Sequence, residues 1–178
     1  MQNIVVLCDY QSVYGGNFIA SLNALEKKAY DYGYHFIYVF PSGARDRDWI
    51  KVLQSEGKEI EFIEKINSKI KTVKVISAII KQKKSDILYV HFGFLLSAEL
   101  VSLFHPSVKV FIHVHSDFSA GKKKIKEKIK DIVLYRVLSL RCKYLCVSQD
   151  FLKLCPKRTV YIPNGLADER VTCKPYKW

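Results

Sequence analysis

The sequence lacks the short motifs that mark several common classes of enzyme and secreted protein. The dinucleotide-binding pattern G-x-G-x-x-G is absent, which disfavours a nicotinamide or flavin enzyme, and so is the G-x-S-x-G turn of hydrolases. Cysteine occurs five times, an odd number without a C-x-x-C pair, so neither a disulfide framework nor a zinc ribbon is indicated. We interpret Cys8, Cys142, Cys146, Cys155 and Cys173 as reduced residues and expect no metal site.

Long hydrophobic runs are also missing. No stretch approaches the roughly 20 apolar residues that a membrane-spanning helix needs. The first apolar stretch, residues 4–8, ends at Asp9 and has no basic segment before it, so no secretory signal peptide is expected. We predict a cytoplasmic protein in which any contact with a membrane is peripheral and at the inner face.

Arginine is scarce although the chain is strongly basic. Lys and Arg number 29 against 17 Asp and Glu, and the resulting net charge of +12 favours an anionic partner. Few side chains, however, carry a planar guanidinium group, which forms paired hydrogen bonds to a base edge or a phosphate. Arginine occurs only at Arg45, Arg47, Arg136, Arg141, Arg158 and Arg170. We therefore expect no specific recognition of nucleic acid, although a non-catalytic nucleotide- or nucleic-acid-binding α/β module remains the alternative function.

Short β-branched runs alternate with longer amphipathic segments along the chain. The runs predict strands at residues 4–8, 35–40, 59–63, 87–91, 109–114, 143–147 and 159–162. The amphipathic segments predict helices at residues 17–32, 47–55, 68–83, 94–104, 122–141 and 149–154. The strands are apolar on both faces, which is typical of a parallel sheet covered by helices on each side.

This alternation predicts an α/β fold: a Rossmann-like, doubly wound, mainly parallel sheet of about seven strands in a single domain. We place the domain at residues 1–165 and a tail or the start of an interdomain linker at 166–178. In such sheets ligands gather beyond the carboxyl ends of the strands, so the residues that follow each strand are the candidates for function.

A glycine pair follows the first predicted strand. Gly15 and Gly16 stand before the helix that Asn17 opens, and glycines there let backbone amides approach a phosphate, whose charge the helix N-terminus also favours. A tight turn without a ligand is the equally weighted alternative.

Histidines follow two further strands. His91 ends the fourth, while His113 and His115 end the fifth and share one side because they are two positions apart. We favour contact with a substrate over metal binding, because no fixed spacing of Cys or His completes a zinc set. Ser116 and Asp117 come next in the chain, and Ser148 suits the N-cap of the helix after the sixth strand.

Several of these segments resemble family-4 glycosyltransferases with the GT-B fold. The similar segments are Gly15-Gly16-Asn17-Phe18-Ile19-Ala20-Ser21-Leu22, residues 86–91, Val114-His115-Ser116-Asp117, Ser148-Gln149-Asp150-Phe151-Leu152 and Ile162-Pro163-Asn164-Gly165. The resemblance implies the N-terminal, acceptor-binding domain of a retaining enzyme that transfers a hexosyl-type sugar from a nucleotide-sugar, in bacterial surface polysaccharide or glycolipid synthesis. It also implies that the enzyme needs no metal, and we expect no cofactor.

The resemblance assigns roles to residues. It places Gly15 and Gly16 at the donor phosphates and gives His115 a catalytic contact with the transferred sugar or the glycan or lipid-linked acceptor. The cleft would be completed by Asn17, His91, His113, Ser116, Asp117 and Ser148. Pro163, Asn164 and Gly165 would lead into the nucleotide-sugar domain, which this chain lacks, so we expect the isolated chain to be inactive. A scaffold that kept the fold and lost the chemistry is a further alternative.

A basic segment lies between the fifth and sixth strands. Ile125, Ile129, Ile132 and Val133 recur at helical spacing within it, so the segment predicts either a core-facing helix with a solvated lysine face or a helix that meets an anionic membrane. The two roles are compatible. The lysines concerned are Lys122, Lys123, Lys124, Lys126, Lys128 and Lys130.

This segment makes a prediction for vesicle co-sedimentation. The protein should bind vesicles that contain anionic lipid, and binding should fall as salt rises, because each lysine near such a surface contributes about 1 kcal/mol that salt screens. Replacing Lys123, Lys124 and Lys126 with Glu should weaken binding. Equal binding to neutral vesicles, or none to anionic vesicles at low salt, would show that these lysines form only a solvated face.

Overall fold

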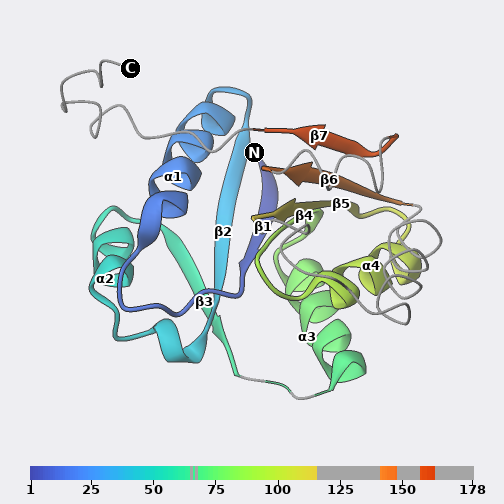
Figure 1. Ribbon diagram of the computed structural model, residues 1–178, viewed down its shortest axis with the longest axis horizontal. Coiled ribbons are helices and arrows are strands. Elements are labelled where there is room, and N and C mark those ends of the chain that lie inside the picture. The colour runs from blue at the N-terminus through green and yellow to red at the C-terminus, as the bar shows by residue number, and fades with distance from the viewer. Residues whose placement is uncertain (65, 67, 116–140, 148–156, 163–178) are drawn as a thin grey trace, which may run out of the picture.

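The computed structural model describes residues 1–64, 66, 68–115, 141–147 and 157–162. This part of the chain contains seven strands and four α-helices, which alternate as far as the fifth strand (Figure 1). The strands are β1 (Gln2–Cys8), β2 (Tyr34–Pro41), β3 (Glu59–Ile63), β4 (Ser85–His91), β5 (Lys109–Val114), β6 (Cys142–Cys146) and β7 (Thr159–Tyr161). The helices are α1 (Gly16–Asp31), α2 (Asp48–Ser55), α3 (Lys69–Gln82) and α4 (Leu95–Phe104), with a 3-10 turn at Ser42–Ala44.

All seven strands run parallel in one sheet of order β3-β2-β1-β4-β5-β6-β7. The chain therefore builds outward from β1 to β3, returns to place β4 on the other side of β1, and builds outward again. The order reverses between β1 and β4, whose pairing runs from Asn3 with Ser85 to Cys8 with His91. In doubly wound sheets this reversal opens a crevice at the carboxyl ends of the two central strands.

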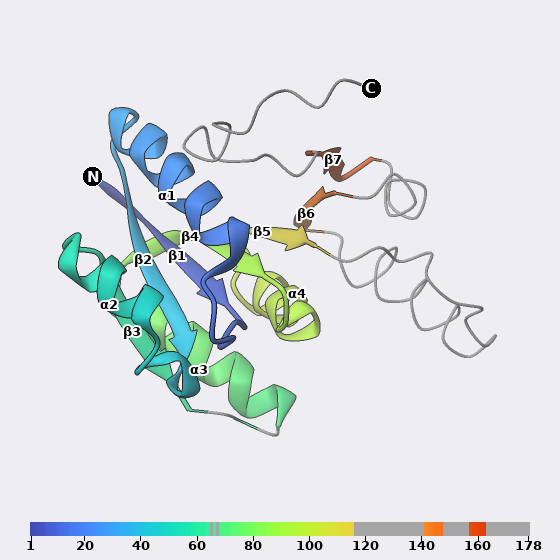
Figure 2. The ribbon, with the colours of Figure 1, turned by 60° about the vertical axis from the view of Figure 1, so that its left-hand side comes forward.

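Helices cover both faces of the sheet, as Figures 1 and 2 show. Because successive side chains of a strand point to opposite faces, β1 contributes to two separate cores. Val5 and Leu7 pack with the buried residues of α3 and α4, whereas Val6 and Cys8 pack with those of α1 and α2. The apolar character of β1 on both faces is thus explained by two layers of helix.

The predicted fold class is confirmed, and all seven predicted strands are present with bounds shifted by two residues at most. Four of the predicted helices are present; those at residues 122–141 and 149–154 lie outside the described residues, apart from Arg141. Cys8, Cys142 and Cys146 are buried, as expected of core cysteines. Among the described residues, no helix has the length and apolar character needed to cross a bilayer.

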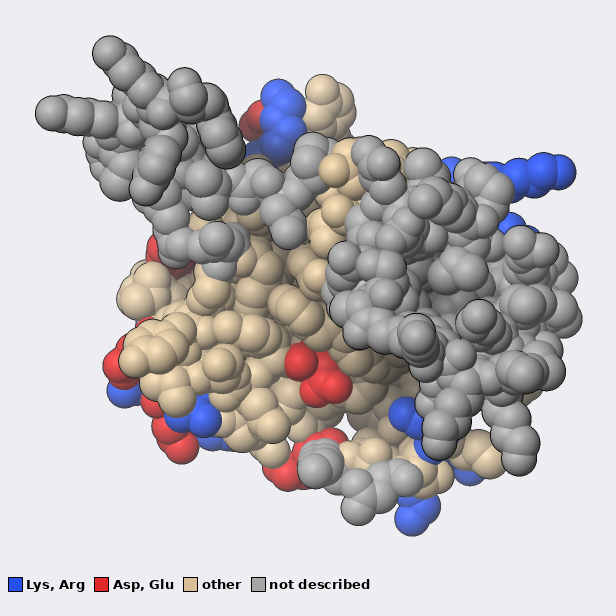
Figure 3. Space-filling view, viewed as in Figure 1, with Lys and Arg blue, Asp and Glu red and all other residues tan. Residues whose placement is uncertain are grey.

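Charged side chains are spread over the described surface. In Figure 3 the lysines and arginines of the described residues are scattered along the rim of the face shown and interspersed with acidic groups. Several form ion pairs, such as Lys58 with Glu26 and Lys83 with Glu59 and Glu61. On this face the described surface thus mixes groups of both signs and shows no compact basic patch.

One carboxyl group is buried beneath the sheet. Glu99 on α4 is fully buried and accepts a hydrogen bond of 2.5 Å from the hydroxyl of Tyr144 on β6. Its second oxygen, Oε2, has no hydrogen-bond partner among the described residues. Burial raises the pKa of Glu99 to about 7, although the Tyr144 hydrogen bond acts in the opposite direction.

The buried Glu99 carboxyl predicts a pH-dependent stability. The folded pKa lies above the ordinary value of 4.5, so the folded state holds the proton more tightly, and stability should fall as pH rises from about 4.5 to about 7. Glu99→Gln should remove this dependence and raise the free energy of unfolding at pH 8 by about 3 kcal/mol. Urea denaturation at pH 5 and pH 8 measures both, with the exposed Glu56→Gln as control. A Glu99→Gln protein that is less stable than wild type at pH 8 would contradict the prediction.

Candidate functional site

Two loops meet at the carboxyl edge of the central strands. Residues 9–15 connect β1 to α1, and residues 92–94 connect β4 to α4. The backbone amide of Asp9 donates a hydrogen bond of 3.2 Å to the carbonyl of His91 at the end of β4, and the Asp9 side chain lies against Gly93 in the second loop. These loops and the end of β5 form the candidate site, which lies at the reversal of strand order (Figure 2).

The β1–α1 loop is held by side chains of α2 and its N-cap. Trp49 Nε1 donates a hydrogen bond of 3.0 Å to the carbonyl of Ser12, and Arg47 Nε donates one of 3.1 Å to the carbonyl of Gln11. Within the loop, the hydroxyl of Tyr10 donates to the carbonyl of Tyr14 at 2.6 Å. The sequence analysis missed Arg47 and Trp49 because they lie far from the loop in sequence.

Both predicted glycines have a conformational reason to be glycine. Gly16 has a φ of +62°, which L side chains rarely adopt, and a Cβ on Gly15 would lie 2.9 Å from Cβ of Trp49. Helix α1 begins at Gly16 without a side-chain cap and without an acidic residue in its first turn. Its first amides thus lack the usual side-chain acceptor, which is the arrangement found where helix N-termini bind anions.

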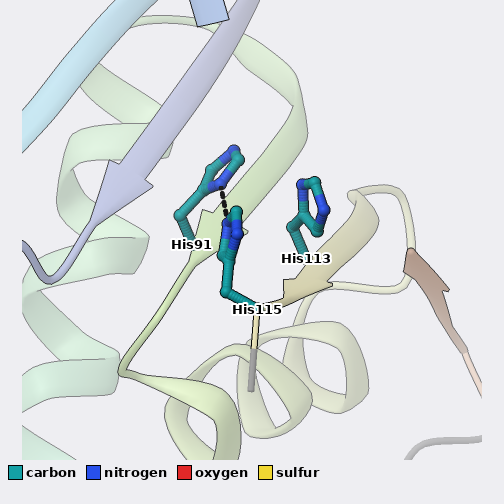
Figure 4. A group of neighbouring side chains, drawn as sticks. All are labelled: His91, His113 and His115. Carbon is teal, nitrogen blue, oxygen red and sulfur yellow. Dashed lines mark hydrogen bonds between the residues drawn. The ribbon is translucent and has the colours of Figure 1, made fainter. Parts of the chain in front are cut away.

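The three predicted histidines come together (Figure 4), and Phe18 in the first turn of α1 contacts two of them. His91 at the end of β4 and His113 on β5 are register partners, and His115 follows β5 by one residue. A hydrogen bond of 2.8 Å joins His91 Nδ1 to His115 Nε2. The rings of His113 and His115 stack with centroids 4.1 Å apart, and His113 Nδ1 lies 2.9 Å from the hydroxyl of Tyr89. We call these three residues the histidine cluster.

Burial keeps the histidine cluster uncharged. Loss of solvation lowers the pKa of His113 and of His115 to about 4 and lowers the pKa of His91 well below its ordinary value. At neutral pH each imidazole is therefore neutral and has one nitrogen lone pair for a hydrogen bond or a metal. Nε2 of His91 and Nε2 of His113 are buried and find no hydrogen-bond partner within the described part of the chain.

Aromatic side chains line the histidine cluster on one side. Phe92 stacks on His115 with ring centroids 4.3 Å apart. The ring centroid of Phe18, in the first turn of α1, lies 6.3 Å from that of His91 and 6.4 Å from that of His115. Tyr10 contacts both Phe18 and Phe92. We call Gly15 and Gly16 the glycine turn. Phe18 connects this turn to the histidine cluster, so that the two predicted features form one site.

The β4–α4 loop has an unusual backbone that the sequence analysis did not identify. Phe92 and Phe94 have φ values of 65° and 62°, which are uncommon for bulky residues and cluster at functional sites when they occur. Between them, Gly93 lies against the side chain of Asp9 so closely that a Cβ would overlap the carboxylate. The sequence signal was the run Phe92-Gly93-Phe94 directly after His91.

The remaining predicted site residues lie outside what the structure describes. Asn17 belongs to α1, but its side chain is not described. The others are Ser116, Asp117, Ser148, Pro163, Asn164, Gly165 and the lysines of residues 122–130. Their proposed roles stay predictions.

No protein-family model matches the sequence, and no curated protein matches it significantly. Solved structures do match. A glycosyltransferase from Rickettsia africae superposes with a TM-score of 0.67 at 17% identity. The match covers 92% of this chain and 43% of the glycosyltransferase chain. Anabaena HepE, solved in complex with UDP-glucose, gives a TM-score of 0.64 at 14% identity, covering 93% of this chain and 44% of its own. MurG from Acinetobacter baumannii superposes with a TM-score of 0.58 at 14% identity. The match covers 98% of this chain and 50% of the MurG chain.

The chain has the fold of the N-terminal half of GT-B glycosyltransferases. It spans about half the length of these structures, between 43% and 50%. The expected GT-B half-domain is thus confirmed as a fold, and at these identities the likeness concerns the fold alone.

The contact between Gly93 and Asp9 predicts an energetic coupling. Gly93→Ala should destabilise the protein by about 1–3 kcal/mol, because the added methyl group overlaps the Asp9 side chain. Asp9→Gly in the same protein should restore most of that loss in urea denaturation. Gly33→Ala is the control, since its cost comes from a φ of +81° with no atom within 4 Å, and Asp9→Gly should not relieve it. Equal effects of Asp9→Gly on both variants would refute the coupling.

Proposed function

We propose that this chain is the acceptor-side half of a retaining glycosyltransferase that transfers a sugar from a nucleotide-sugar. The observation that carries the proposal is the meeting of the glycine turn and the histidine cluster at the reversal of strand order, in a fold shared with one half of GT-B glycosyltransferases. In such a half, the crevice at the carboxyl ends of β1 and β4 is where a ligand binds.

The glycine turn supplies the donor-facing part of the proposed site. The first amides of α1 carry no side-chain cap, and the helix dipole places partial positive charge at the same point. A diphosphate of a nucleotide-sugar fits such a turn. That HepE was solved with UDP-glucose supports this class of donor. The main donor contacts would come from a second half, because the chain spans only about half the length of its structural neighbours.

His115 supplies the acceptor-facing part of the proposed site. One of its nitrogens, Nε2, is engaged by His91, so Nδ1 is the atom that would contact a sugar hydroxyl. Its pKa of about 4 means that the ring is neutral at pH 7, so Nδ1 bonds to that hydroxyl as donor or acceptor, according to its tautomer, without adding charge. Phe92, which stacks on the ring, limits its rotation.

The acceptor in this proposal is a glycan or lipid-linked glycan made at the cytoplasmic face of a bacterial membrane. The support is the net charge of +12 and the lysines of residues 122–130, which would attract the protein to anionic lipid. Surface polysaccharide or glycolipid synthesis is the process that joins such acceptors to nucleotide-sugars.

A transfer assay on the full-length protein that contains this chain tests the proposal. His115→Ala should reduce kcat about 100-fold while leaving the melting temperature within a few degrees of wild type, because the ring acts on the substrate and is only half-buried. His105→Ala is the matched control. His105 follows the C-terminal end of α4, away from the histidine cluster, and forms a hydrogen bond with Ser77 on α3. Wild-type kcat in a folded His115→Ala protein would remove His115 from the site. Absence of transfer from any nucleotide-sugar by the wild-type protein would overturn the proposed function.

A further inference from the structure

We propose that His91, His113 and His115 form a binding site for one divalent transition-metal ion of the zinc class. This inference goes beyond glycosyl transfer and does not depend on it. Three imidazoles and an open coordination position are a donor set that zinc uses in proteins. Spacing in the sequence did not reveal the set, because the ligands come from two strands that only the folded sheet brings together.

The geometry of the histidine cluster carries the proposal. One ring nitrogen from each histidine lies within 4.8 Å of those of the other two. Zinc–nitrogen bonds of about 2.0–2.1 Å in a tetrahedral arrangement require the nitrogens to stand about 3.4 Å apart. The widest separation must therefore shrink by little more than an ångström, while the 2.8 Å pair of His91 and His115 must open slightly. Both changes require the imidazole rings to rotate about their side-chain bonds, because His113 and His115 now stack face to face.

The unpartnered nitrogens are an independent observation that points to a ligand. His91 is 2% exposed, and its Nε2, like Nε2 of His113, has no hydrogen-bond partner among the described residues. A buried polar atom without a partner costs about 1–3 kcal/mol, so such atoms in a native protein require an explanation. A metal ion bound through Nε2 of His113 removes that cost at this atom. His113 and His115 are only half-buried, which leaves a path for the ion to enter.

The neighbours of the cluster suit neutral, ligating imidazoles. Tyr89 Oη lies 2.9 Å from His113 Nδ1, so Nδ1–H can donate to the hydroxyl while Nε2 turns its lone pair to the metal. The proton now shared by His91 and His115 would move to the other nitrogen of its ring, so binding requires a change of tautomer and no net loss of a proton. Tyr89 is thus a positioning residue for the metal.

Within the described residues the potential ligand group consists of the three histidines alone, so none of these residues occupies a fourth position. A water molecule or an oxygen of a ligand in the crevice would fill it. Imidazole donors suit zinc, copper, nickel and iron, and they bind magnesium and calcium poorly. The proposal therefore predicts selectivity for transition metals over magnesium.

Metal titration of the purified, EDTA-treated chain tests this site. Zn²⁺ should bind with one equivalent and raise the melting temperature by about 5 °C or more at a 100-fold excess over Kd. Co²⁺ should give the visible absorption bands of a four-coordinate site without the near-ultraviolet band of a thiolate ligand. Mg²⁺ should have neither effect.

Variants identify the ligands. His113→Ala and His115→Ala, the two less buried positions, should each weaken Zn²⁺ binding more than about 100-fold, and Tyr89→Phe should weaken it about 10-fold. His105→Ala should bind like wild type, because His105 lies outside the cluster. Circular dichroism confirms that each variant is folded. Absence of stoichiometric Zn²⁺ binding, a thiolate band with Co²⁺, or wild-type affinity in folded His113→Ala and His115→Ala would overturn the proposal.

Discussion

The parallel pairing of β1 with β4 is the constraint on which the rest of the structure depends. It places the ends of two strands that are far apart in the sequence side by side, while the helices that follow them cover opposite faces of the sheet. The glycine turn arises from the first loop and His91 from the end of the partner strand. His113 joins them because β5 pairs with β4 in register. Each component of the candidate site therefore follows from the strand order.

Burial of imidazoles at this edge has an energetic cost that an apolar crevice would avoid. Desolvation lowers the pKa of all three rings, and two ring nitrogens lack partners among the described residues. The aromatic contacts with Phe18 and Phe92 add dispersion energy but satisfy no hydrogen bond. The strained backbone at Phe92 and Phe94 adds to this cost. Packing alone does not account for such a combination, whereas a ligand that bonds to the imidazoles does.

The sequence predicted the layers well because β-branched runs and amphipathic spacing are local signals. The rule that ligands gather at the carboxyl ends of strands then placed Gly15, His91, His113 and His115 at one edge without knowledge of the contacts. Local patterns could not show that His91 bonds to His115, since that bond depends on the relative rotation of two side chains from different strands. Nor could they show the roles of Trp49 and Arg47, which reach the β1–α1 loop only in the folded chain.

The glycine turn shows how structural and functional explanations overlap at such a site. Gly15 is required where the backbone approaches Trp49, and Gly16 where φ is positive, so both residues have a reason that involves no phosphate. The same conformation, however, starts α1 without a side-chain cap beside the neutral imidazoles. A capping serine or aspartate would satisfy those amides and, in the case of aspartate, repel an anion. The specific argument for a ligand is therefore the missing cap, and the glycines make that arrangement geometrically possible.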